Sequence, residues 1–461
     1  MSLDKITRRE FLRKSMLLSA ALGTAGPLAL NMAVMGEAAA QAASSSSDYK
    51  ALVCIFLVGG NDYGNTVIPY DAANYNAYAQ IRGQVAYQQS ALAGTVLKPK
   101  TALPDARQMA LAPELAPLAS LFEAGKLGVL LNVGPLVQPV TLAQYNANSV
   151  PLPPKLFSHI DQQTYWQALS QQAGANGWGG RIGDLMLSGN GGSMFTAMSV
   201  NGNALLLSGT NEAQFDVSAG GAVNLRETSQ PLFGSSACSQ ALVSLTTQSR
   251  TNVMENALTR MMQRGITGNQ QITAALKGVP ALTTAFDSTN SLAMQLQMVA
   301  KLIAARSALG VKRQVFFVSL GGFDTHTDLN EVHPGLLAKL AGAMNSFYNA
   351  TVELGVSNQV ASFTASEFGR TLSPNGDGSD HGWGSHHFVM GGAIQGQNFY
   401  GTLPVTAVNG PDDVGQGRLL PSTAVDQLAA PLASWFGVSG ANMPLILPNG
   451  GNFNLNALSL F

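Results

Sequence analysis

Histidine is scarce in this sequence, and half of its histidines fall in one short segment. The 461-residue chain has six histidines, and His381, His386 and His387 all lie within residues 379–387, together with Asp380. Imidazole and carboxylate groups are ligands that zinc and manganese accept in proteins. This histidine-rich segment is therefore a candidate metal or catalytic site. The alternative is a solvated, glycine-containing loop whose histidines only form hydrogen bonds.

Predicted strands elsewhere in the chain are also followed by acidic or histidine side chains. Residues 51–58 and 314–320 are continuous apolar runs, which are typical of strands buried on both faces, and another strand is predicted at 359–364. Parallel strands joined by crossover helices end at one edge of the sheet, where open α/β folds bind ligands. The polar residues behind these strands should therefore converge with the histidine-rich segment; they are Asp62, Asp324, His326 and Glu367.

The other predicted elements are those of an α/β protein. Further strands are predicted at 127–133 and 388–390, and helices at 252–264, 291–309 and 335–354. The last two helices carry apolar residues at every third or fourth position, so one face of each should pack on a sheet.

A central region and a C-terminal helix complete the chain. Residues 176–250 combine short strand-like runs with Gly, Ser and Asn, which we interpret as an insertion over the sheet or a mobile cap. A final helix should begin near Ser422, and Pro431 should kink or end it. Residues 51–461 are therefore predicted to form a single α/β domain, with a doubly wound, mostly parallel sheet and helices on both faces.

The N-terminal region is predicted to be an export signal. Arg8 and Arg9 precede a mildly apolar stretch at 16–35, and small residues follow before a Ser-rich leash at 41–50. Residues 1–40 thus resemble a twin-arginine signal peptide. The expected partner is the twin-arginine translocation machinery, and the expected location is the periplasm or the cell exterior. An uncleaved membrane anchor is the alternative, since this apolar stretch is long enough to span a bilayer.

Composition excludes several classes of protein. With 11% charged residues and a formal net charge of -1, the chain offers no basic field for nucleic acid or for an anionic membrane surface. The chain has two cysteines, Cys54 and Cys238, which are too few for an iron–sulfur cluster or a thiolate-rich zinc site. Any metal should therefore be held by Asp and His side chains.

Four motifs carry a resemblance to a known family. Residues 59–62, 321–326, 367–371 and 380–382 resemble the secreted, twin-arginine-exported family called domain of unknown function 1501, which is similar in fold to the alkaline phosphatase and sulfatase superfamily. The resemblance covers nearly all of residues 50–460. It implies an alkaline phosphatase-like fold with divalent metal ligands at the strand tips, zinc or manganese being favoured and calcium possible. The implied ligands are Asp62, Asp324, His326, Asp380, His381 and one or both of His386 and His387.

Three further residues are candidates for the chemistry itself. Ser158 should sit at a helix N-terminus, where backbone N–H groups and the helix dipole favour an anion, although a plain N-cap is the alternative. Thr66 is the second candidate nucleophile. Arg370 could bind a substrate oxyanion, or it could form a structural ion pair. His159 is expected to be structural and His333 exposed.

The function predicted from these residues is metal-dependent hydrolysis of a small anionic ester, a phosphate or a sulfate. A metal ion would lower the pKa of a hydroxyl or water and hold the transferred group. The alternative is a secreted binding or assembly protein that keeps the fold without turnover.

Overall fold

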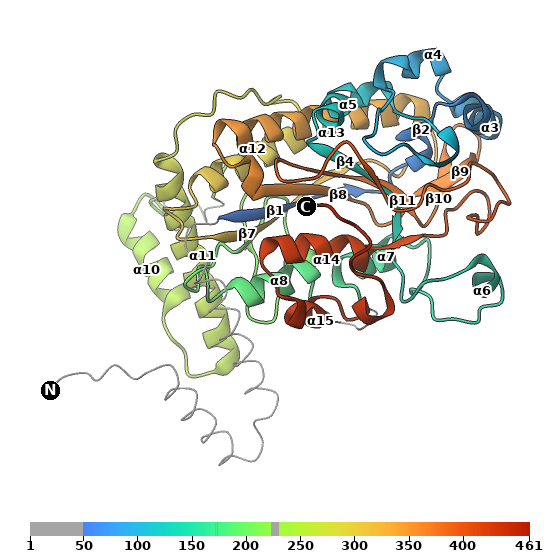
Figure 1. Cartoon of the computed structure of the whole chain (residues 1–461). Helices are drawn as coiled ribbons and strands as arrows, with labels where there is room; N and C mark the ends of the chain where they lie inside the picture. Colours follow the sequence, from blue (N-terminus) through green and yellow to red (C-terminus); the bar gives the residue numbers. More distant parts are fainter. Residues whose placement is uncertain (1–48, 171, 173, 223–229) are drawn as a thin grey trace.

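The structure is a computed structural model that describes residues 49–170, 172, 174–222 and 230–461 (Figure 1). The predicted export signal and nearly all of the leash lie outside these residues. Within the described part, none of the helices combines the length and the hydropathy that a membrane crossing requires.

A mostly parallel sheet of nine strands forms the centre of the fold. The strand order is β12–β4–β11–β8–β1–β7–β5–β6, and β13 pairs with β4. β11 is antiparallel to both of its neighbours, whereas β1 is parallel to β7 and β8. The strands are β1 (Lys50–Val58), β4 (Leu127–Gly134), β5 (Ala197–Ser199), β6 (Phe215–Asp216), β7 (Arg313–Gly321), β8 (Val360–Ala365), β11 (Ser385–Gly391), β12 (Phe399–Tyr400) and β13 (Thr423–Ala424).

The central strand β1 shows why the apolar runs in the sequence become buried strands. Its successive side chains point to opposite faces, so Val53 and Ile55 enter one hydrophobic cluster while Leu52 and Phe56 enter the other. All four side chains are fully buried. A strand without a solvent-facing side needs apolar residues at every position, as predicted.

Helices cover both faces of the sheet, which confirms the predicted α/β class (Figure 1). One layer contains α5 (Ala116–Glu123), α12 (Ser291–Ala304) and α13 (Leu329–Glu353). The other layer contains α7 (His159–Ala168), α8 (Trp178–Met186), α14 (Val425–Phe436) and α15 (Met443–Ile446).

Smaller elements lie beside this core. The antiparallel pair of β9 (Arg370–Pro374) and β10 (Ser379–His381) sets Arg370 opposite His381. β2 (Val67–Pro69) pairs with β3 (Met109–Leu111). The remaining helices of this part are α3 (Ala72–Arg82), α4 (Gln89–Leu92) and α6 (Leu142–Asn146).

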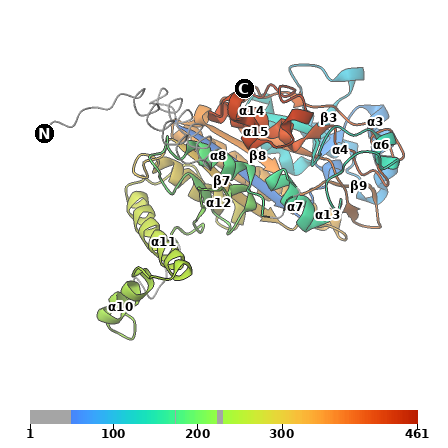
Figure 2. The ribbon, with the colours of Figure 1, turned by 90° about the horizontal axis from the view of Figure 1, so that it is seen from below.

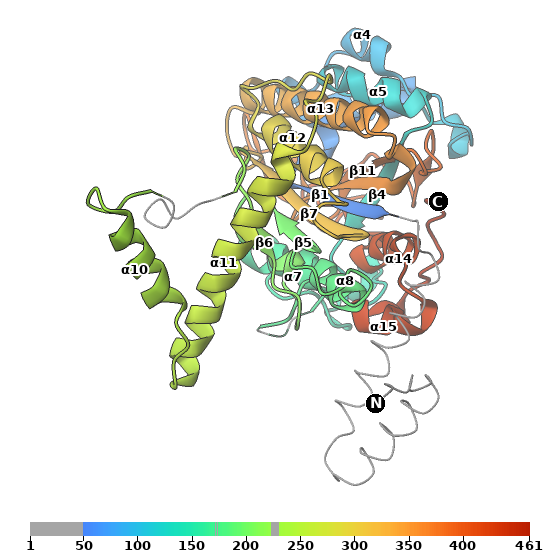
Figure 3. The ribbon, with the colours of Figure 1, turned by 90° about the vertical axis from the view of Figure 1, so that its left-hand side faces the viewer.

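The region predicted as an insertion divides into two parts. β5 and β6 extend the central sheet beside β7, so they belong to the core. By contrast, α10 (Ser236–Thr247) projects from the body as an arm, together with the N-terminal part of the helix that follows the region, α11 (Val253–Lys277) (Figures 2 and 3). Ile272 and Ala275, near the end of α11, pack into the core. α11 also continues well beyond the predicted end at residue 264.

Pro431 was predicted to kink or end its helix, and it does not end it. α14 runs through it to Phe436, and its residues Leu428 and Leu432 are fully buried against the sheet. Burial of this apolar face offsets the hydrogen bond that proline cannot donate.

Candidate metal centre

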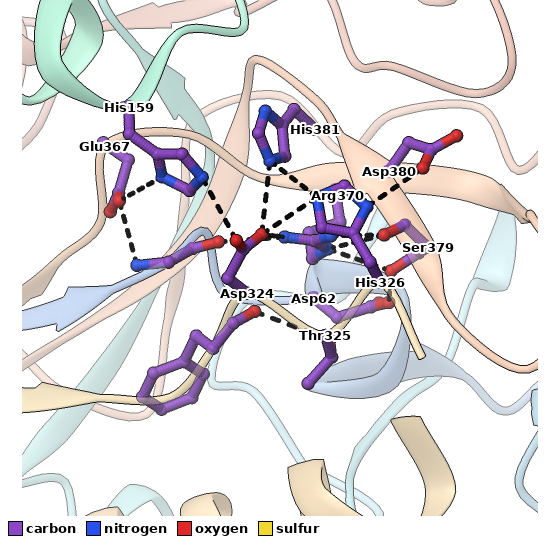
Figure 4. A network of polar contacts seen from close by, with 12 residues as sticks. Asp62, His159, Asp324, Thr325, His326, Glu367, Arg370, Ser379, Asp380 and His381 are labelled. Atoms are coloured by element: carbon purple, nitrogen blue, oxygen red, sulfur yellow. Dashed lines mark hydrogen bonds and ion pairs between the residues drawn. The ribbon is translucent and has the colours of Figure 1, made fainter. Parts of the chain in front are cut away.

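Four side chains from three parts of the chain meet beyond the carboxyl ends of β1, β7 and β8 (Figure 4). Asp324 and His326 follow β7, His159 is the first residue of α7, and His381 ends β10. The strand ends approach closely because residue 59, which follows β1, is a glycine. A Cβ atom there would lie 2.3 Å from the Asp324 backbone nitrogen, and the φ of +121° also favours glycine.

The Asp324 carboxylate is the centre of this cluster. Its Oδ1 lies 3.1 Å from His326 Nε2 and 3.2 Å from His381 Nε2, and its Oδ2 lies 3.4 Å from His159 Nε2. The two nitrogens His326 Nε2 and His381 Nε2 are 2.9 Å apart. Ligand atoms about 2.1 Å from a tetrahedral ion lie about 3.4 Å from one another, and the contacts of His159 and His381 with Asp324 are close to this spacing, whereas the distance between His326 and His381 is shorter. His159, Asp324 and His381 form a candidate metal-binding triad, and His326 lies beside it.

Each of the three imidazoles is oriented through its other nitrogen. The Nδ1 atoms of His159 and His326 lie 3.0 Å from Glu367 Oε1 and 3.1 Å from Asp380 Oδ1, respectively. The Nδ1 of His381 donates to the Phe157 carbonyl oxygen at 2.7 Å. An acceptor on Nδ1 places the proton there and leaves the Nε2 lone pair of the neutral ring free. Histidines that bind metals are oriented in this way.

The backbone at Phe157 is adapted to this contact. Its φ of 71° lies in the left-handed region, which is uncommon for a bulky residue. Such conformations persist where the surroundings hold them, often at functional sites. Here the consequence is that a main-chain carbonyl, rather than a side chain, fixes the His381 ring.

The electrostatics favour the protonation states that a metal needs. Burial opposes ionisation of Asp324, but Arg370, His159 and His326 together lower the pKa of its carboxyl. Burial lowers the pKa of His381, although the Phe157 carbonyl opposes this. The hydrogen bond to Glu367 raises the pKa of His159 against the effect of burial. At neutral pH Asp324 is thus a carboxylate and His381 a neutral ligand, while a metal must compete with a proton for His159.

Arg370 holds the Asp324 carboxylate in position. Its buried guanidinium donates from Nη1 to Asp324 Oδ1 and to the Gly59 carbonyl, both at 2.9 Å, and from Nε to the Ser379 carbonyl at 3.1 Å. Its Nη2 also donates to the Ser379 carbonyl. Because these donors are engaged within the protein, the geometry matches the structural ion pair rather than a group that faces a substrate oxyanion.

Asp62 and Thr66 do not belong to the cluster of candidate ligands. The buried Asp62 carboxylate forms an ion pair with Arg82 at 2.8 Å and accepts hydrogen bonds from Ser379 Oγ and Asn65 N. Its oxygens are therefore engaged within the protein. The Thr66 hydroxyl is fully buried and donates to the Asp62 carbonyl at 2.6 Å, so a substrate cannot reach it.

His386 and His387 also lie apart from the cluster, inside the sheet. They are the second and third residues of β11, and successive strand residues point to opposite faces. His386 Nδ1 accepts from the Asn132 N–H at 3.0 Å, and the His387 ring packs edge-on against Trp166. Burial lowers the pKa of each ring to about 3. Because β11 pairs with a strand on either side, both histidines lie in the core.

Ser158 occupies the predicted N-cap position of α7, next to His159. Its hydroxyl donates to Asp161 Oδ2 at 2.7 Å instead of capping a backbone N–H. The prediction that His333 is exposed was wrong, because it is buried with its Nε2 3.1 Å from Asn61 Oδ1.

The sequence reasoning missed one residue of the cluster, His159, for which it expected a structural role. It did predict that Glu367 lies at this edge of the sheet, but it gave Glu367 no role. The signal that could have found His159 is its place beside Ser158, which was predicted to sit at a helix N-terminus and was itself a candidate for the chemistry.

Fold and site together define an α/β protein with a candidate metal centre at its strand tips. The chain belongs to the family described as "Protein of unknown function (DUF1501)", whose model matches residues 49–445. This match confirms the family resemblance seen in the sequence. No curated protein matches the chain.

Distant solved structures show similarity at the level of the fold. "Crystal structure of Ps i-CgsB" is 10% identical, with a TM-score of 0.35, over 89% of this chain and 78% of that one. "Crystal structure of the C-terminal periplasmic domain of EcEptC from Escherichia coli- complex with Zn" is 11% identical, with a TM-score of 0.31, over 90% of this chain and 92% of that one. At these TM-scores neither similarity carries an argument about function.

Proposed function

We propose that this protein is an exported, metal-dependent hydrolase of phosphate or sulfate esters. The observation that carries the proposal is the convergence of three imidazole Nε2 atoms on the Asp324 carboxylate, with each Nδ1 held by an oxygen acceptor. Hydrogen bonding alone does not require three rings to be oriented toward one carboxylate. A shared ion does.

The type and charge of the ligand atoms favour particular metals and particular substrates. His159, Asp324 and His381 would hold the ion, and two nitrogens with one oxygen suit zinc or manganese better than calcium, which prefers oxygen. A divalent ion with one carboxylate and two neutral imidazoles keeps a net charge of about +1, which favours an anionic substrate. When bound, such an ion supplies a Lewis acid that polarises the ester. Asp324 is 45% exposed, so the centre opens to solvent.

Ser158 is the nucleophile in this proposal. Its hydroxyl already donates to Asp161, so the carboxylate can accept the proton as Oγ attacks the phosphorus or sulfur atom. A bond forms between Oγ and the phosphorus or sulfur atom while the bond from that atom to the ester oxygen breaks, and the leaving oxygen takes up a proton from solvent. Water then hydrolyses the serine ester and releases the acid, and the proton on Asp161 returns to Oγ. A water molecule is the alternative nucleophile, since Thr66 is inaccessible.

Elemental analysis and an ester assay test the proposal together. The purified protein should contain zinc or manganese, and chelation should abolish turnover of aryl phosphate or aryl sulfate. Ser158→Ala should abolish turnover while metal is retained, and the exposed Ser120→Ala should behave as wild type. No metal after metal-replete preparation would overturn the site. Metal without turnover of either ester class would instead leave a binding protein.

The location is tested separately. Replacement of both Arg8 and Arg9 by lysine should trap the protein in the cytoplasm, while Arg13→Lys should leave export unchanged. Export of the double variant would contradict the twin-arginine route.

A further inference from the structure

We propose that a polar hollow beside the metal centre binds the leaving group of the substrate, and that this group is a neutral, polyhydroxylated unit such as one or two sugar residues. The inference rests on the proposed hydrolase function and names its substrate class. The hollow has a volume of about 330 Å³ and is lined by residues of α7, the end of β1, β7 and the loop after β5. This volume lies near the lower end of small-molecule sites.

The hollow and the metal centre share the elements that line them, although none of the cluster residues lines the hollow itself. Gln163 and Gln167 line it, and they follow His159 on α7 by four and eight residues, which places all three on one face of the helix. The helical rise sets these glutamines about 6 and about 12 Å from His159 along the axis. Val58 also lines the hollow, and its neighbour Gly59 donates to Glu367 Oε1, the atom that holds His159. A group bonded to an ester at the metal centre would therefore extend into this space.

The polar side chains that line the hollow can form hydrogen bonds with the hydroxyl groups of a ligand. All of the described residues that line the hollow are uncharged. The Gln163 side chain makes no hydrogen bond within the described part of the chain, and the residue is half-buried. Gln167 and Asn203 use their amide oxygens on Leu206 N and Gln214 Nε2, which leaves their NH₂ groups as donors. Asn201 donates to Ser319 Oγ, which leaves its oxygen as an acceptor. Donors and acceptors are thus both offered, as sugar hydroxyls require.

Other leaving groups fit less well. A charged group would find no counter-charge in the lining, and an alkyl chain would leave the amides without partners. A peptide in extended form needs an open strand edge, but β1 and β7 are interior strands that pair on both sides. The neutral polyol is the class that satisfies the amides.

Ligand binding to metal-free protein tests this assignment independently of turnover. The chelated protein is applied to an array of neutral oligosaccharides of different hexoses and linkages, beside end-blocked neutral peptides, and affinities of the hits are measured by calorimetry. We compare wild type with Gln163→Leu, which keeps the size and helix propensity of the side chain but removes its hydrogen bonds. Gln271→Leu, an exposed position on α11 away from the hollow, is the matched control.

We expect wild type and Gln271→Leu to bind neutral oligosaccharides equally, and Gln163→Leu to bind them roughly five- to tenfold more weakly, the loss expected for one or two neutral hydrogen bonds. Absence of any oligosaccharide hit, preference for peptides, or undiminished binding by Gln163→Leu would each overturn the assignment. Sugar binding without ester turnover would remove the hydrolase and leave the hollow's ligand class standing. Turnover of aryl esters without sugar binding would remove this inference alone.

Discussion

Replacement of Glu367 by glutamine separates the charge of this residue from its shape. Glu367 is fully buried, and one oxygen, Oε1, receives both the Gly59 N–H at 2.9 Å and the His159 Nδ1 at 3.0 Å. A glutamine oxygen in the same place accepts both hydrogen bonds. The change therefore removes the negative charge behind His159 while the ring keeps its orientation.

The expected result is weaker metal binding at neutral pH. A carboxylate behind a ligating histidine makes the ring more basic, and loss of such a partner typically lowers metal affinity 10- to 100-fold, or about 1.4 to 2.8 kcal/mol. The assay is competition with a chromophoric zinc chelator between about pH 6 and pH 8, the range in which histidine titrates. Glu255→Gln, an exposed change on the projecting α11, is the control.

The pH dependence gives a second readout with a definite sign. The pKa of His159 is raised in the folded metal-free protein, so its protonated form contributes stability that is present below the unfolded pKa of about 6.5 and is lost as pH rises through the folded value. Metal needs the neutral ring, so wild-type affinity should fall as pH drops through that same value. In Glu367→Gln this fall should move to lower pH. Wild-type affinity and an unmoved pH profile in the variant would refute the assignment of His159 as a ligand.

Two further predictions concern residues that the structure places outside the cluster. Arg82→Met should lower the free energy of unfolding, measured in urea, by about 3–5 kcal/mol, because the Asp62 carboxylate stays buried without its partner. The metal content per folded molecule should stay unchanged. Loss of metal would instead indicate that Asp62 belongs to the site. His387 has a pKa lowered by burial to about 3, so the unfolded chain binds more protons and stability should fall as pH drops from about 6.5 toward 3, by about 1.4 kcal/mol per pH unit for each such ring. His387→Leu should therefore reduce the slope of unfolding free energy against pH in this range by the contribution of one ring. Parallel stability–pH curves for variant and wild type would contradict this.

Much of the fold could be predicted from the sequence, because the patterns that indicate strands and helices are local. The apolar run of β1 predicts a strand buried on both faces, and the three- and four-residue spacing in α12 and α13 predicts helices with one buried face. Pro431 shows the limit of this reasoning. Its local cost led to the prediction of a kink or an end, but α14 continues through it, because Leu428 and Leu432 on either side are buried against the sheet.

The candidate site divides in the same way. The chain order of the strands predicted that Asp324, His326 and His381 would lie at one edge of the sheet, since parallel strand ends share an edge. Only the tertiary structure decided that His159 joins the cluster with its ring held by Glu367, that the Phe157 carbonyl fixes His381, and that His386 and His387 are buried in the core. Residue type and strand order determine which groups come near an edge. The direction of each side chain depends on how α7 docks and on the pairing of β11 with a strand on either side, and these are set by contacts between segments far apart in sequence.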